Sequence, residues 1–205
     1  MLRSWLGNRL LRVALPGAVA LAALLPAPLY AASGPTFITS CNPTYVISSP
    51  GAYVVANDLT AAPVSDCIDV AASNVVLDLG GHNLSSPPHE GIGISIFRRA
   101  AGLRIVNGVV TGFAGGIETS ANGTIIEGIT VEGNLLVGIA EFSFIPGRFI
   151  NGGVIANTVT SGNGLDRIEV FGGRGLRIAN NTADDNGVDG IAVLAASSSA
   201  NVVAG

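Results

Sequence analysis

The feature that most restricts the fold of this 205-residue chain is a repeat of aliphatic residues every 22 to 29 positions. One series of isoleucines consists of Ile68, Ile92, Ile117, Ile139, Ile168 and Ile191. A second series consists of Leu77, Ile105, Ile126, Ile155 and Ile178, with Val202 or Val203 next. In three successive repeats, a residue of the second series precedes one of the first by 13 positions. Such regularity predicts one structural unit per repeat, stacked on the next.

Asparagine and glycine recur at set positions around these anchors. Asparagines stand five residues before a first-series isoleucine at Asn134, Asn163 and Asn186. Others stand two residues after a second-series isoleucine at Asn107, Asn157 and Asn180, and Gly128 takes this place in the remaining repeat. Both residue types tolerate the left-handed backbone of tight turns. With 28 glycines and no helical periodicity, the chain does not fit a helical solenoid.

Short β-branched runs between such turns are strands that cannot bury a face alone. Stacked about 4.8 Å apart in successive coils, they bury the isoleucines as internal columns. We therefore expect an all-β fold, a right-handed parallel β-helix (solenoid) of about five to six coils. Within the coils, Gly91, Gly116, Gly138 and Gly190 each precede a first-series isoleucine.

Several segments resemble secreted right-handed parallel β-helix repeat proteins of the pectate-lyase-like superfamily. They are Ser73-Asn-Val-Val-Leu-Asp-Leu-Gly-Gly-His-Asn-Leu84, Leu176-Arg-Ile-Ala-Asn-Asn-Thr182, Pro50-Gly-Ala-Tyr53 and Asn57-Asp-Leu59. The resemblance covers about residues 41–205 and implies the fold. It does not imply one activity, because this fold carries pectate lyases, polygalacturonases, epimerases and proteins without catalysis.

The first 31 residues have the order of a secretory signal peptide. Arg3, Arg9 and Arg12 precede an apolar run at Val13–Leu25, and small residues follow at Ala31 and Ala32. The run falls short of the ~20 residues needed to span a membrane. We predict a signal peptide at 1–31, a linker at 32–40 and the β-helix at 41–205, in a secreted, periplasmic or cell-surface protein without a membrane anchor after cleavage.

Cys41 and Cys67 are the only cysteines, and both follow the predicted cleavage site. In an oxidising compartment an even pair predicts a disulfide, with two free thiols as the alternative. At the other end, residues 201–205 begin a coil and stop. An open coil exposes strand edges, so we expect either a truncated chain with missing C-terminal coils or a capping partner.

The position after each first-series isoleucine should point outward and carries Asp69, Gly93, Glu118, Ala140, Glu169 and Ala192. A carboxylate thus alternates with a small residue. If every second coil carries one, Glu118 and Glu169 lie about 9–10 Å apart, near the upper limit for an inverting glycosidase pair. Simple avoidance of like-charge repulsion between adjacent coils explains the pattern better.

Further candidate site residues lie near this column. Arg167 replaces the recurring glycine before Ile168, which predicts a side chain on the face of Glu169. The segment 141–153 is longer than equivalent connections and contains Phe144 and Arg148, which we expect to contact a ligand. The candidate catalytic residues are therefore Glu118, Glu169 and Arg167, and the candidate substrate-binding residues are Arg148 and Phe144.

Asp166, Asp184, Asp185 and Asp189 allow calcium as a cofactor, but turn capping explains them better. We expect no metal site and no cofactor. After residue 12 the chain has seven arginines, no lysine and fourteen acidic residues, which argues against nucleic acid as a partner.

The functional expectation is an exported protein that binds extended polysaccharide along a lateral face of the solenoid. A polysaccharide lyase or glycosidase is one alternative, and a non-catalytic surface or structural protein is another. Whether the chain is an enzyme stays open, because no established catalytic motif accompanies the carboxylates.

Overall fold

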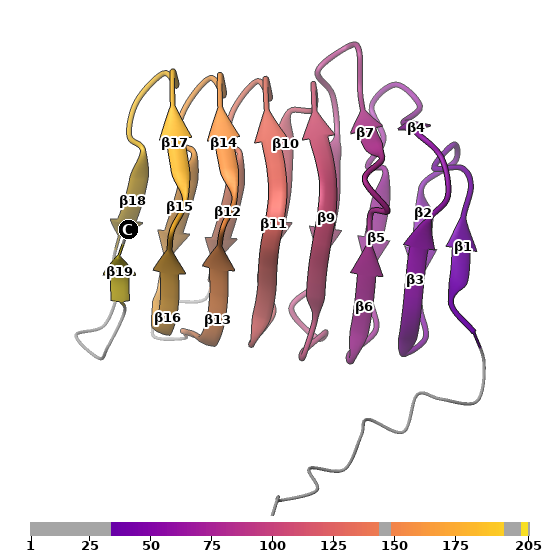
Figure 1. The fold of residues 1–205 in the computed structure, drawn as a ribbon, viewed down its shortest axis with the longest axis horizontal. Coiled ribbons are helices and arrows are strands. Elements are labelled where there is room, and N and C mark those ends of the chain that lie inside the picture. The colour runs from indigo at the N-terminus through magenta and orange to yellow at the C-terminus, as the bar shows by residue number, and fades with distance from the viewer. Residues whose placement is uncertain (1–33, 144–148, 195–201, 205) are drawn as a thin grey trace, which may run out of the picture.

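A computed structural model of the protein describes residues 34–143, 149–194 and 202–204. Over these residues the chain forms a parallel β-solenoid of about six turns (Figure 1), which confirms the all-β class. No helix among them is long and apolar enough to cross a membrane. The predicted signal peptide, 1–31, lies outside the described residues.

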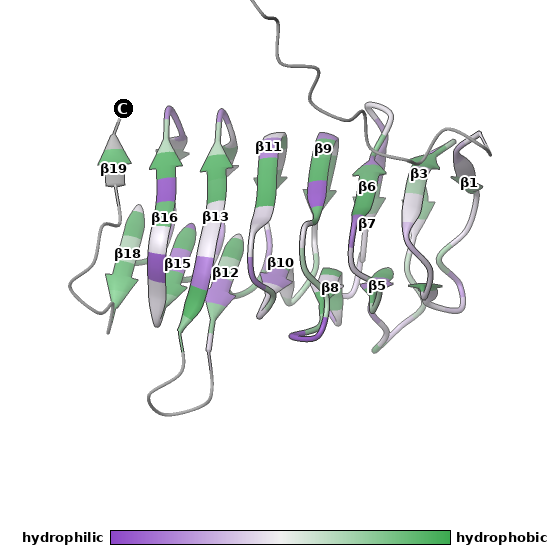
Figure 2. Ribbon diagram, turned by 90° about the horizontal axis from the view of Figure 1, so that it is seen from below, coloured by the Kyte–Doolittle hydropathy of each residue, from purple (hydrophilic) through white to green (hydrophobic). Residues whose placement is uncertain are grey.

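Two parallel sheets form the walls of the solenoid and lie as separate layers in Figure 2. The seven-stranded sheet, called sheet B, contains β2 (Tyr45–Ile47), β5 (Ile68–Val70), β8 (Ile92–Ile96), β10 (Gly115–Thr119), β12 (Ile139–Phe142), β15 (Ile168–Phe171) and β18 (Ile191–Leu194). Each strand pairs with its equivalent in the next coil, never with its neighbour in sequence.

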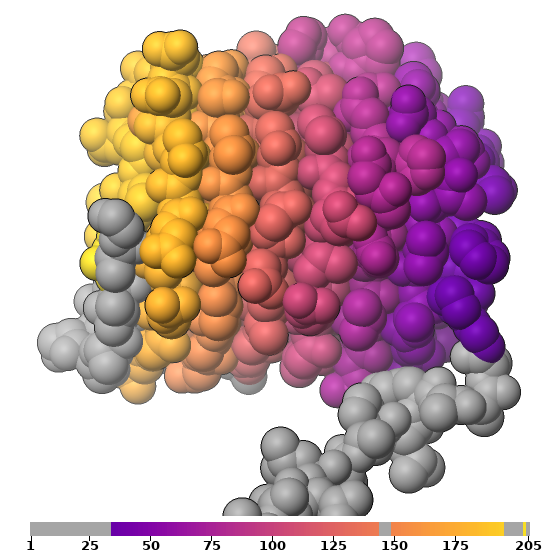
Figure 3. Space-filling view, viewed as in Figure 1, coloured from indigo at the N-terminus to yellow at the C-terminus, as the bar shows by residue number. Residues whose placement is uncertain are grey.

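The twelve-stranded sheet, called sheet A, bends into two rows. Its main row contains β1 (Thr36–Ile38), β3 (Gly51–Val55), β6 (Val75–Asp78), β9 (Arg104–Thr111), β11 (Thr124–Glu132), β13 (Ile150–Ala156), β16 (Gly173–Ala179) and β19 (Val202–Ala204). Its side row contains β4 (Leu59–Thr60), β7 (Asn83–Ser85), β14 (Val159–Ser161) and β17 (Thr182–Asp184), and β9 and β11 extend through both rows. The coils appear as successive bands in Figure 3.

The isoleucine columns fill the interior as predicted, with one correction. The second series is in register from Leu77 to Ile178, and Val203, not Val202, continues it. In the first series, Ile94 and not Ile92 pairs with both Ile68 and Ile117.

At this coil the sequence contains the Gly-Ile pattern twice, as Gly91-Ile92 and Gly93-Ile94. The spacing of the repeat therefore does not show which isoleucine belongs to the column. A Cβ on Gly93 would lie 2.3 Å from Val110 Cγ1, so only glycine fits there. Gly116 occupies the equivalent place in the next coil, where a Cβ would lie 2.4 Å from the Gly138 carbonyl oxygen. Gly93 therefore has the role that the spacing assigned to Gly91.

The asparagines that precede Ile139, Ile168 and Ile191 form a ladder along the solenoid. The Asn163 Oδ1 accepts the backbone N–H of Asn134 at 3.0 Å and its Nδ2 at 2.9 Å. Asn134 Oδ1 accepts the Phe113 N–H at 3.0 Å, and Asn186 Oδ1 accepts the Asn163 N–H. The ladder satisfies backbone donors at the bend between the side row and sheet B. Asn107, Asn157, Asn180 and Gly128 all have positive φ, as their turn positions predict.

The first coil is closed covalently. Cys41 and Cys67 form the predicted disulfide, and no cysteine remains free. The solenoid starts before the expected boundary at residue 41, because β1 pairs with β3 and Ile38 is fully buried.

Replacement of Asn163 by alanine should destabilise the solenoid by about 2–4 kcal/mol, because it leaves the buried Asn134 backbone N–H unpaired and removes the hydrogen bonds of Asn163 with Asn134 Nδ2 and the Val131 carbonyl. Thermal unfolding followed by circular dichroism should show a melting temperature lower by roughly 5–10 °C. Asn57→Ala, at an exposed asparagine, is the control. Equal melting temperatures for the two variants would show that the asparagine ladder does not stabilise the solenoid.

Candidate functional site

The outward column of sheet B is as the sequence predicts, with one substitution. Parallel register aligns Asp69, Ser95, Glu118, Ala140, Glu169 and Ala192. Ser95 stands where Gly93 was expected, as the shift from Ile92 to Ile94 requires. Carboxylates therefore still alternate with small residues along the solenoid axis.

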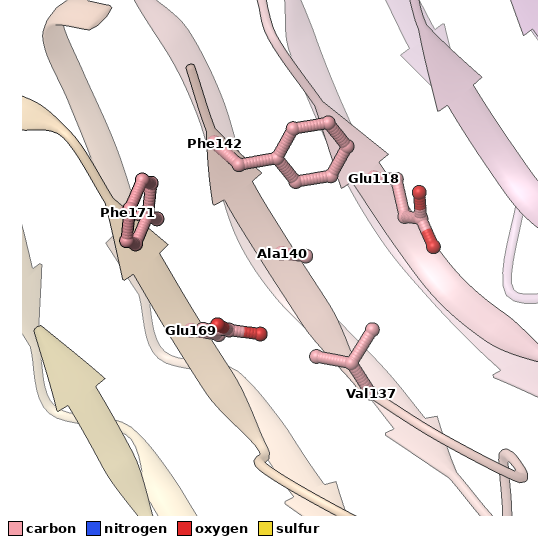
Figure 4. Close-up of a pocket in the computed structure, with 6 residues that line it drawn as sticks. All are labelled: Glu118, Val137, Ala140, Phe142, Glu169 and Phe171. Atoms are coloured by element: carbon pink, nitrogen blue, oxygen red, sulfur yellow. The ribbon is translucent and has the colours of Figure 1, made fainter. Parts of the chain in front are cut away.

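A hollow of about 480 Å³ opens on this face at β10, β12 and β15. It is lined by Glu118, Val137, Ala140, Phe142, Glu169 and Phe171. Figure 4 shows Glu118 and Glu169 on either side of Ala140, with both phenylalanines toward one end of the strands and Val137 toward the other. The structure thus brings together two of the predicted site residues.

Small residues create this space. Ala140 lies between the two glutamates in the register, and its short side chain leaves the floor of the hollow low. At Gly115, a Cβ would lie 2.4 Å from Glu118 Oε1. The Glu118 carboxylate therefore occupies space that any side chain at position 115 of the same strand would fill.

Two phenylalanines form the apolar end of the hollow. Phe142 pairs in register with Phe171, and Leu194 follows in the next coil. Phe142 belongs to the segment 141–153 that was expected to be a long connection, and Phe171 was not among the predicted site residues. Their common position, three residues after a first-series isoleucine, is the signal that would have found both. Phe171 is 44% exposed, so this apolar column faces solvent.

The environment of both glutamates disfavours their ionised form. Partial burial raises the pKa of Glu118, and the carboxylates of Asp66 and Glu169 raise it further. Partial burial also raises the pKa of Glu169, to which Asp166 adds like-charge repulsion. At the next carboxylate of the column, burial and the Asp66 carboxyl raise the pKa of Asp69 to about 6.

Arg167 does not lie at the hollow. Its guanidinium donates a hydrogen bond to the Ala183 carbonyl of β17, and its Nη1 would lie 3.0 Å from a Cβ on Gly190. The side chain is thus turned into the bend between the side row and sheet B. The other two predicted ligand contacts, Phe144 and Arg148, lie outside the described residues. From the same segment, the Phe149 ring lies 3.9 Å from the Arg174 guanidinium, at sheet A.

The aspartates before sheet B have structural partners. Asp66 Oδ1 accepts the Ile92 N–H at 2.8 Å, and Asp166 Oδ1 accepts the Asp189 N–H at 3.1 Å. Each therefore caps the turn of the next coil, and for Asp166 this is the role expected in preference to calcium binding. No group of three or more potential ligands among the described His, Cys, Asp and Glu residues is placed to hold a metal ion.

One buried carboxyl was not among the predicted site residues. Glu141, beside Ala140 on β12, points inward and is 2% exposed, and its Oε1 has no hydrogen-bond partner. It occupies the column of Thr119 and Val170. A Cβ on Gly153 would lie 3.2 Å from this oxygen, so glycine makes room for the side chain. Burial raises the pKa of Glu141 to about 8.

Comparison of the chain with models of protein families, with curated proteins and with solved structures gives no match. The fold by itself defines a protein with a parallel β-solenoid and an acidic, partly aromatic hollow on one lateral sheet.

Glu141 should make the stability of the protein fall as the pH rises. Its folded pKa of about 8 exceeds the ordinary 4.5, so the folded state holds its proton more tightly. The stabilisation is complete below about pH 4.5 and is lost as the pH rises through 8. Glu141→Gln keeps the shape without the charge and should exceed the wild type in stability at pH 9 by on the order of 3 kcal/mol.

Urea unfolding at pH 5, 7 and 9 measures this effect. Asp69, Glu118 and Glu169 titrate in both proteins, so their effect on the pH dependence cancels in the difference in unfolding free energy between Glu141→Gln and wild type. Glu132→Gln, at an exposed carboxylate of β11, is the control and should follow the wild type. A constant difference between Glu141→Gln and wild type across the three pH values would refute the assignment.

Proposed function

We propose that this protein is exported and binds an extended polysaccharide along the outer face of sheet B. The disulfide supports an oxidising compartment. The observation that carries the proposal is the hollow, where carboxylates stand beside the partly exposed rings of Phe142 and Phe171. Carboxylate oxygens accept hydrogen bonds from sugar hydroxyls, and phenylalanine rings pack against the apolar faces of sugar rings.

The direction of the columns favours a long ligand over a small one. Glu118, Ala140 and Glu169 belong to three successive coils, as do Ser95 before them and Ala192 after them. The outward column continues past the hollow through Ser95 and Ala192, so a chain-like ligand could extend over the neighbouring coils. A rigid polymer also loses less conformational freedom on binding than a flexible one.

Blocking the hollow should abolish polysaccharide binding. Ala140→Trp places a large ring between Glu118 and Glu169, and binding of oligosaccharides on a glycan array should be lost. Thr130→Trp, on the outer face of β11 in sheet A, is the matched control and should bind as the wild type does. If Ala140→Trp does not fold, the double variant Phe142→Ala, Phe171→Ala replaces it and should bind at least tenfold more weakly. Absence of any glycan binding by the folded wild type would end the proposal and favour a structural role.

Glycoside hydrolysis is the second candidate, and the pair of glutamates favours it. Two coil spacings separate them by about 9–10 Å, near the upper limit of the inverting geometry, in which a water attacks across from the general acid. Glu118 faces two like charges and is the better general acid, which leaves Glu169 as the base. A lyase is less well supported, because no described basic side chain lines the hollow.

Hydrolysis would release reducing ends from the oligosaccharide that binds, and proton NMR of the fresh product should show inverted anomeric configuration. Glu118→Gln and Glu169→Gln should each lower the rate at least 100-fold, since each removes one of the two proton-transfer groups. Glu132→Gln should leave the rate unchanged. Binding without release of reducing ends would exclude this candidate and retain the binding function.

A further inference from the structure

Arginine is unevenly distributed between the two sheets, whereas carboxylates lie on the strands of both, with Asp78, Glu127, Glu132 and Asp184 in sheet A. The strands of sheet B contain Asp69, Glu118, Glu141 and Glu169 and no basic residue. Asp66, Asp166 and Asp189 stand two residues before three of these strands, and Arg167 stands directly before β15 with its guanidinium bonded to the Ala183 carbonyl, away from the hollow. The arginines that lie within described strands, by contrast, are Arg104, Arg174 and Arg177, all in sheet A.

The carboxylates of the hollow are not neutralised by the protein. The two ion pairs among the described residues join His82 to Asp58 and Arg104 to Glu127, away from the hollow. Glu118 instead interacts unfavourably with Asp66 and Glu169, and Glu169 with Asp166. A ligand with positive charge would remove this repulsion, whereas a polyanion would add to it.

We propose that the polysaccharide bound in the hollow carries amino groups, as a partly or fully deacetylated amino-sugar polymer does. Its ammonium groups pair with Glu118 and Glu169, and its sugar rings lie against Phe142 and Phe171. This inference rests on the proposed binding function and names its substrate class. It excludes uronic-acid polymers as the ligand of this face.

The shape of the face favours such a polymer over a cationic peptide. A peptide commonly binds a β-protein by pairing with a free strand edge. β10, β12 and β15 are each paired on both sides, so the hollow offers no free edge. Alternating carboxylates, about 9–10 Å apart along the axis, match instead a stiff chain with regularly spaced charges.

The test compares four ligands of equal length by isothermal titration calorimetry with the folded protein at pH 6. They are a glucosamine hexamer, an N-acetylglucosamine hexamer, a galacturonate hexamer and hexalysine. We expect the glucosamine hexamer to bind at least tenfold more tightly than its N-acetylated counterpart, with an affinity that falls as salt increases. The galacturonate hexamer should not bind, and hexalysine should bind at least tenfold more weakly than glucosamine.

The double variant Glu118→Gln, Glu169→Gln should lose the preference for glucosamine and bind both amino-sugar hexamers alike. The control, Glu132→Gln with Asp185→Asn, changes the net charge equally but away from the hollow, at exposed positions of β11 and the turn after β17. It should retain the preference, which separates local pairing from the general charge of the protein.

The outcomes distinguish this inference from the proposed function. Equal binding of the two amino-sugar hexamers by the wild type, or tight binding of galacturonate, would overturn the amino-group assignment and leave polysaccharide binding intact. Hexalysine bound as tightly as glucosamine would make a cationic peptide the ligand and overturn the inference. If none of the three sugars binds here and none binds on the glycan array, the proposed function fails as well.

Discussion

Parallel pairing between equivalent residues of successive coils is the constraint on which this structure depends. A single coil has strands of two to nine residues and cannot bury its apolar side chains or pair its backbone groups alone. Both requirements are met only when each coil lies on the next in register. Ile117 therefore pairs with Ile139, and Ile139 with Ile168, and none of the three exposes any surface.

The same stacking forms the outer surface. Once the inner columns are in register, the residues one position further along are in register too and point away from the interior. Like charges on adjacent coils would repel, and the small residues Ser95, Ala140 and Ala192 keep the carboxylates on alternate coils. The interval that relieves repulsion also provides the hollow. An arrangement that serves stability thus creates the space in which a ligand can lie.

Glu141 is an exception to the apolar packing of the inner columns. Its column is otherwise formed by residues such as Ile96, Thr119 and Val170, which bury at little cost. The buried carboxyl with an unpartnered oxygen stands in the same coil as Ala140, directly behind the floor of the hollow. Departures of this kind from a regular pattern tend to concentrate near functional sites.

Much of the fold was predictable from the sequence, because a repeat makes one local choice many times. The spacing of Ile126 and Ile139 and the asparagines at the bends specify strands, turns and coil length together. The positions of Glu118 and Glu169 on the outward face of the coils followed from the same repeat spacing. The pairing of Cys41 with Cys67 followed from their number and from the predicted oxidising compartment. These features depend on the order of residues along one coil, which the sequence states directly.

Tertiary packing decided between positions that the spacing of the repeat could not distinguish. Gly91-Ile92 and Gly93-Ile94 match the repeat equally well, and the pairing of Ile94 with Ile68 and Ile117 shows which of them continues the column. Arg167 was expected outside, but Gly190 and Ala183 leave a place for its guanidinium inside the bend. The hollow itself requires Ala140 and Phe171 from different coils. A sequence determines which residues recur, whereas the volumes that meet across coils determine where each side chain can lie.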